Sequence, residues 1–131
     1  MPARRTARLV LTVAAFAPLS SCSPPPIDIA AERDGDRLRL TLSQRRGFIF
    51  GGSRAPCVRE IALHESETAD RDHPRWQIVT TGGVQCLELQ SVALGEVPGG
   101  WQETVPLSAV RGRTYTVAAT GIGSGEILIS F

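Results

Sequence analysis

Residues 37–42 read Arg-Leu-Arg-Leu-Thr-Leu, a strict alternation of polar and apolar side chains. Successive side chains of an extended strand point to opposite faces, so this stretch predicts a β-strand with its leucines buried and its polar residues solvated. The same period of two recurs near the end of the chain, in residues 115–119 and 127–131. We therefore expect strands, each with one face in a core.

Glycine or proline interrupts the apolar alternation every eight to twelve residues from Ile27 onward, and no stretch has convincing helical periodicity. This spacing is typical of an all-β sandwich or barrel. The fold class that we predict is all-β, a small antiparallel β-sandwich of about seven to eight strands, with a small closed barrel as the alternative. The expected strands are 27–31, 37–42, 57–64, 75–80, 86–94, 101–105, 113–120 and 125–131.

Residues 107–117 resemble the tyrosine corner that precedes the penultimate strand of immunoglobulin and fibronectin type III sandwiches. In those domains a tyrosine hydroxyl hydrogen-bonds to backbone upstream and fixes the crossing between the sheets. Tyr115 is the only tyrosine of the chain. The resemblance implies an Ig-like sandwich in which the Tyr115 hydroxyl reaches backbone near residues 107–112. Val117 stands where antibody domains carry their second cysteine, so a disulfide must lie elsewhere.

The N-terminus has the layout of an export signal. Three arginines lie within the first eight residues, residues 9–17 are mainly apolar, and Leu-Ser-Ser-Cys follows at 19–22. This layout resembles the lipobox of bacterial lipoproteins, in which an aliphatic residue and two small residues precede a cysteine. The resemblance implies that signal peptidase II removes residues 1–21 and that Cys22 carries a lipid.

A secretory signal without lipidation is the alternative, and it would leave Cys22 as an odd thiol. A transmembrane helix is disfavoured, because the apolar run over residues 9–19 is well short of roughly 20 residues and contains Pro18. We expect three parts, namely a signal peptide at 1–21, a lipidated cysteine with a proline-rich spacer at 22–26, and a β-sandwich domain at 27–131.

The lipobox resemblance also implies a location and a partner. A lipid would tether the protein to the bacterial cell envelope, and Ser23 after the cysteine points, by analogy with enterobacterial lipoproteins, to the outer membrane on its periplasmic side. The mature chain would lose three of its fourteen arginines and none of its thirteen acids, giving a net charge of −2. This balance gives no reason to expect nucleic acid as a partner. The expected partners are the membrane and another envelope protein.

Two further cysteines remain when Cys22 is assigned to the lipid. Cys57 and Cys86 would then form a pair in an oxidising compartment, which predicts one disulfide. A metal or redox pair is the alternative, but the cysteines are far apart and lack a CxxC partner or a histidine at ligand spacing. In the chain-entropy model such a bridge stabilises the fold by roughly 3 to 4 kcal/mol.

Residues 44–54 are the best candidate for recognition, because arginines and glycines flank bulky apolar side chains there. Arginine and aromatic residues are enriched at interface hot spots. The alternative, which we favour for the aromatic residues, is that they continue the buried face of 38–42 past a bulge at Gly47. The candidate partner-binding residues are Arg45, Arg46, Phe48, Phe50 and Arg54.

Other side chains could serve function, but each has a structural interpretation that we prefer. Trp76 and Trp101 could stack on a sugar ring, yet tryptophans of this kind more often fill a core. Gly121-x-Gly123-x-Gly125 could be taken for a phosphate loop, but a strand follows where that chemistry needs a helix, so we interpret it as a hairpin connection.

Few side chains of this chain could support catalysis. Several imidazole and carboxylate groups lie close in sequence and could in principle bind a divalent cation, namely His64, Glu65, Glu67, Asp70, Asp72 and His73. Their spacing fits no recognised site, and Arg71 and Arg75 can neutralise the acids, so we expect a solvated loop with no metal and no cofactor. No serine lies in a nucleophile elbow.

The sequence therefore predicts a non-enzymatic, lipid-anchored module of the cell envelope that binds or scaffolds. The main alternative is a periplasmic inhibitor or ligand-binding lipoprotein whose 44–54 loop enters a target. An envelope hydrolase is the third possibility.

Overall fold

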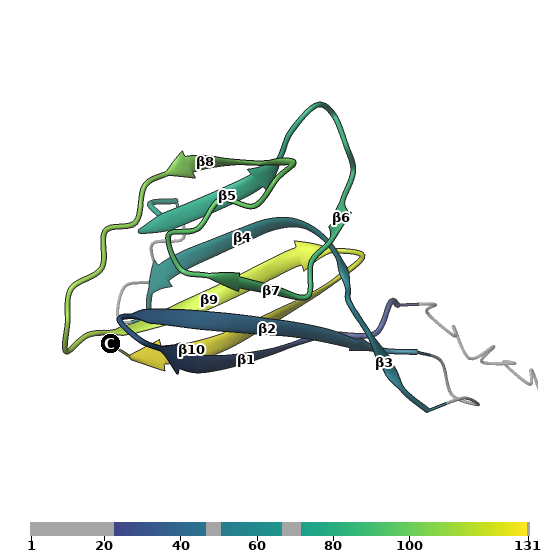
Figure 1. Cartoon of the computed structure of the whole chain (residues 1–131), viewed down its shortest axis with the longest axis horizontal. Coiled ribbons are helices and arrows are strands. Elements are labelled where there is room, and N and C mark those ends of the chain that lie inside the picture. Colours follow the sequence, from purple (N-terminus) through teal and green to yellow (C-terminus); the bar gives the residue numbers. More distant parts are fainter. Residues whose placement is uncertain (1–22, 47–50, 67–71, 131) are drawn as a thin grey trace, which may run out of the picture.

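The computed structural model describes residues 23–46, 51–66 and 72–130, which fold into a β-sandwich of two antiparallel sheets (Figure 1). The predicted sandwich is confirmed. The described residues form ten strands and no α-helix, so none of their segments is a helix that could cross a membrane.

The smaller sheet is built around the strand that the opening alternation predicts. This strand, β2, pairs with β1 on one side and with β3 and β7 on the other. The bounds are β1 (Ile27–Asp34), β2 (Arg37–Arg45), β3 (Ser53–Arg54) and β7 (Ser91–Ala93).

The larger sheet has six strands, five of them in the order β10-β9-β4-β5-β8, while β6 pairs with the start of β4. The bounds are β4 (Cys57–Glu65), β5 (Trp76–Thr80), β6 (Leu87–Glu88), β8 (Trp101–Val105), β9 (Thr114–Gly121) and β10 (Gly123–Ser130).

One predicted strand is wrong, the single strand over 86–94. The structure breaks this stretch into β6 in the larger sheet and β7 in the smaller one. The reason lies in the two residues between them, whose backbone bonds to both sheets. Leu89 donates its N–H to the carbonyl of Pro56 at 3.1 Å, and the carbonyl of Gln90 accepts from the N–H of Leu42 at 2.8 Å.

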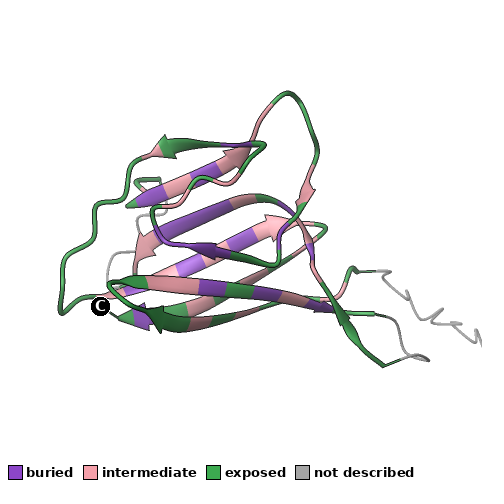
Figure 2. Ribbon diagram, in the orientation of Figure 1, coloured by how far each residue is buried: buried purple, intermediate pink, exposed green. Residues whose placement is uncertain are grey.

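The core lies between the sheets and takes one face of each long strand (Figure 2). Leu40 and Leu42 are buried as the alternation in residues 37–42 predicts, while Leu38 is only partly buried. Trp76 and Trp101 are both buried, which confirms their core interpretation. The Trp76 Nε1–H donates to a carboxylate oxygen of Glu103 at 3.0 Å, so the polar atom of that ring is satisfied.

The tyrosine corner has the local geometry that its resemblance implies. Tyr115 begins the buried face of β9 with its side chain 1% exposed, and its hydroxyl oxygen accepts the backbone N–H of Val110 at 2.7 Å. This bond ties the loop before β9 to the core. The wider relation to immunoglobulin-like domains stays a prediction.

The β9–β10 connection is tighter than the sequence predicts. Ile122 alone links the two strands, and Gly123 takes a φ of +93°. A Cβ on Gly121 would lie 2.1 Å from the carbonyl oxygen of Cys57, and one on Gly125 would lie 1.8 Å from that of Ile27. The hairpin interpretation therefore explains Gly123, whereas the other two glycines let neighbouring backbone approach.

Candidate functional site

The sandwich has two ends with different residues. We call the end that carries residues 23–26 the N-terminal end; β2 finishes there, and β3, β4 and β10 begin there (Figure 1). We call the other end, with the β1–β2 turn and the 106–112 loop, the opposite end. The N-terminal end holds the described residues of the predicted partner-binding segment.

Gln44 ties the N-terminal segment to the sandwich. This glutamine continues the inward face of β2 and is 1% exposed, yet it is polar. Its Nε2 group donates to the carbonyl of Pro25 at 2.7 Å and to that of Ile122 at 2.8 Å. One side chain thus joins three distant segments, because Pro25 precedes β1 and Ile122 turns between β9 and β10.

Gln44 is the first residue of the predicted recognition segment, and its structural role was not predicted. A polar residue at the next inward position after Leu38, Leu40 and Leu42 is the signal that could have revealed it, since buried amides need partners. Gln44 therefore has a structural role, because it holds Pro25, within the predicted spacer, against the domain.

The three predicted partner-binding arginines lie together at this end. Arg45 ends β2, Arg46 follows it, and Arg54 belongs to β3, which pairs with the end of β2. All three are exposed, and within the described ranges none of them forms an ion pair. Phe48 and Phe50 lie outside the described residues, as does Cys22.

An open hollow connects Arg45, one of these arginines, with the start of the described chain. Arg45, Gly52 and Ser53 line it from the β2–β3 side, and Ser23 with Pro25 lines it from the N-terminal segment. Asp28 is the acidic residue among its lining residues. The backbone holds this geometry, because the N–H of Arg46 donates to the carbonyl of Gly52 at 3.0 Å.

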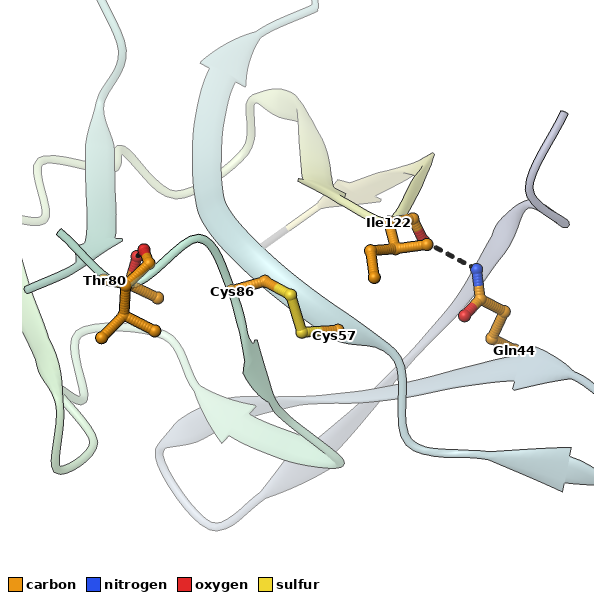
Figure 3. The surroundings of a disulfide bond; sticks show 6 residues. Gln44, Cys57, Thr80, Cys86 and Ile122 are labelled. Atoms are coloured by element: carbon orange, nitrogen blue, oxygen red, sulfur yellow. Dashed lines mark hydrogen bonds between the residues drawn. A yellow bond between two sulfur atoms is a disulfide. The ribbon is translucent and has the colours of Figure 1, made fainter.

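The predicted disulfide is present at the same end (Figure 3). Cys57 and Cys86 are bonded with their Cα atoms 5.2 Å apart, and they join the start of β4 to the chain just before β6. The bridge lies beside the close approach of Gly121 to the carbonyl of Cys57. It therefore fastens the loop before β6 to a closely packed part of the backbone.

The opposite end carries an open hollow of about 440 Å³. Arg33 and Arg37 flank the β1–β2 turn and Arg111 comes from the loop before β9, and all three are exposed. Asp36, in the same turn, adds one acidic side chain, so the lining is net positive. Leu107, which is 39% exposed, adds an apolar side chain to the wall. The sequence analysis did not identify this site, because its residues come from three separate stretches.

The predicted acidic loop is only partly within the described residues, since Glu67, Asp70 and Arg71 lie outside them. Glu65 receives hydrogen bonds from Arg113 and from Arg75, the latter at 3.2 Å. These two guanidinium groups, Arg113 first, lower the pKa of the Glu65 carboxyl below its usual value. Glu65 is thus an ion-pair residue that fastens β4 to its surroundings.

His64 is half-buried in β4 and His73 is exposed in the turn before β5. Across the described ranges, no three side chains from histidine, cysteine, aspartate and glutamate cluster closely enough to hold a metal ion. The described residues instead offer open surfaces with exposed arginines at the two ends of the sandwich.

Comparison with known proteins identifies no relative. No family model matches the chain, and neither a curated protein nor a solved structure is significantly similar to it.

Proposed function

We propose that this chain is a lipid-anchored, non-catalytic module of the bacterial cell envelope that binds or scaffolds another envelope protein. The lipobox at residues 19–22 supports the anchor at Cys22 and, through Ser23, an outer-membrane location facing the periplasm. The Cys57–Cys86 disulfide is consistent with an oxidising compartment.

The observation that carries this proposal is the hydrogen bond between Gln44 and Pro25. Three residue steps separate Cys22 from Pro25, and each step spans at most about 3.6 Å, so the tether is at most about 11 Å long. A lipid on Cys22 would therefore hold the N-terminal end of the sandwich beside the membrane.

The opposite end would then face away from the membrane. The eight residues of β1 span about 26 Å at 3.3 Å per residue, which sets the separation between the two ends. We propose that the hollow with Arg33, Arg37 and Arg111 is the partner-binding surface, and that it accepts an acidic segment of another protein. Guanidinium groups pair with carboxylates through two hydrogen bonds at once.

The inhibitor alternative uses residues 44–54 instead. With a short tether the described part of this segment, residues 44–46 and 51–54, would lie on the membrane side, where a soluble target has less access. We therefore rank it second to recognition at the opposite end.

Substitution of the lipobox cysteine tests the anchor. Cys22→Ala removes the sulfur that would take the lipid, so palmitate labelling should vanish while Ser23→Ala, next to it, retains the label. Equal labelling of Cys22→Ala and the parent protein would contradict the lipid anchor.

Photo-crosslinking in intact cells tests which end binds protein. A crosslinking residue at Leu107 should capture a protein, and charge reversal by Arg37→Glu with Arg111→Glu should abolish that adduct. The matched reversal Arg45→Glu at the N-terminal end should leave it unchanged. A protein adduct at Ser53 that disappears with Arg45→Glu, without one at Leu107, would instead support the inhibitor alternative.

A further inference from the structure

We propose that the N-terminal end is a membrane-contact surface, on which Arg45, Arg46 and Arg54 bind the phosphates of anionic phospholipid headgroups. The inference rests on the proposed lipid anchor at Cys22 and adds a second contact with the same bilayer. It assigns the predicted partner-binding arginines to the lipid surface, and not to a protein.

The position of Arg45 close to the start of the described chain supports this membrane contact. Ser23 directly follows the lipidated cysteine of the proposal, and it lines the same hollow as Arg45. The clamp from Gln44 to Pro25 prevents the domain from swinging away on a long spacer. Any lipid on Cys22 therefore places its bilayer within a short distance of the Arg45 side chain.

The positive charge of the N-terminal end also supports this contact. Residues 44–46 and 51–54 contain three arginines and no acidic residue, and Asp28 is the acid that lines the adjoining hollow. This small surface is therefore net positive although the mature chain would be slightly acidic. A basic residue beside an anionic bilayer strengthens attachment by about fivefold, and the attraction decays within a Debye length of about 8 Å at physiological salt.

The backbone that carries the three arginines is already ordered by strand pairing. Arg45 follows the inward-facing Gln44, so alternation along β2 turns its side chain away from the core, where it is exposed. Arg54 lies opposite Gln44 in the β2–β3 register, so its exposed side chain leaves the other face of this strand pair from Arg45. The N–H of Arg46 donates to the carbonyl of Gly52 at the next rung. The arginines therefore project from both faces of a paired strand end, and little backbone ordering is needed when they bind phosphate.

Arginine footprinting on the lipidated, full mature protein tests this contact. The protein is placed in nanodiscs of phosphatidylcholine alone or with phosphatidylglycerol added, labelled with phenylglyoxal, and mapped by mass spectrometry. We expect labelling of Arg45, Arg46 and Arg54 to fall several-fold in the anionic discs. The matched trio at the opposite end, Arg33, Arg37 and Arg111, should label equally in both.

Salt and single substitutions refine the test. Raising salt to about 1 M shortens the Debye length to about 3 Å and should restore labelling at the N-terminal end. Arg45→Gln should reduce protection at Arg54, whereas Arg37→Gln should not. Equal labelling of all six arginines in both discs would overturn the membrane contact while leaving the anchor intact. Protein without lipid on Cys22 would overturn both proposals.

Discussion

The two ends of the sandwich are held together by different kinds of contact. At the N-terminal end, backbone meets backbone, because Gly121 and Gly125 leave no room for a side chain and the Gln44 amide bridges two carbonyl groups. At the opposite end, side chains make the contacts, through the Tyr115 hydroxyl and the ion pairs of Glu65. The first end is therefore sensitive both to atoms added at these glycines and to the loss of its bridging side chains, whereas the second end is sensitive to the loss of its side-chain contacts.

Truncation of Tyr115 should have the largest effect and tests the side-chain contacts. Tyr115→Ala leaves a cavity in a fully packed core and should lower the free energy of unfolding by about 3 to 5 kcal/mol. Tyr115→Phe keeps the ring and removes the hydroxyl that bonds to Val110, and should cost about 0.5 to 1.5 kcal/mol. Urea denaturation measures both, and a Tyr115→Ala protein as stable as the parent would show that this corner contributes nothing.

Removal of the disulfide should have a similar effect at the N-terminal end. Cys57 and Cys86 are 29 residues apart, and a loop of that length predicts about 3 to 4 kcal/mol of lost stability in the double alanine variant. The difference in stability between the variant and the parent should vanish when the parent protein is reduced before urea denaturation. A free thiol at either position, found by alkylation without reductant, would contradict the bridge.

Loss of the Gln44 amide should have a smaller effect and sharpens the role of the N-terminal end. Gln44→Met keeps the length of the side chain but removes both donors, so we expect a cost of about 1 to 3 kcal/mol from the carbonyl groups left without a partner. Gln102→Met, at an exposed position of β8, is the matched control and should change little. Hydrogen exchange should also rise near Ile27 and Ile122 in Gln44→Met alone.

The pH dependence at Glu65 should have the smallest effect, because its arginine partners are partly solvated. Its pKa is lowered in the folded state from the ordinary value of 4.5, so its stabilisation is complete above that pH and is lost as the pH falls through the lowered pKa. Stability of the parent should therefore fall more steeply below about pH 4.5 than that of Glu65→Gln. Parallel curves would show that the ion pairs add no stability.

The sequence predicts those parts of the fold that depend on short periods. Alternation locates β2 and β9, and the usual burial of tryptophan correctly places Trp76 and Trp101 in the core. The tyrosine hydroxyl bond and the disulfide are found where the residues indicate. It fails at 86–94, because a strand that changes sheets has the same alternation as one that does not. The crossing is set by backbone bonds to Pro56 and Leu42, which are distant in sequence.

The candidate sites also differ in how far the sequence alone predicts them. The arginines of residues 44–54 are adjacent in sequence and could be identified directly, but their position beside Ser23 depends on a bond between Gln44 and Pro25. The hollow at the opposite end could not be predicted, because Arg33, Arg37 and Arg111 meet only when the sheets pack. Composition locates charge, whereas the placement of charge relative to an anchor requires the fold.

Mass spectrometry of the N-terminal peptide of the exported protein decides whether the lipid anchor exists. We predict a peptide that begins at Cys22, lacks residues 1–21, and carries the added mass of a diacylglyceryl group. A mature protein cut at another position, or one with an unmodified thiol at Cys22, would contradict it.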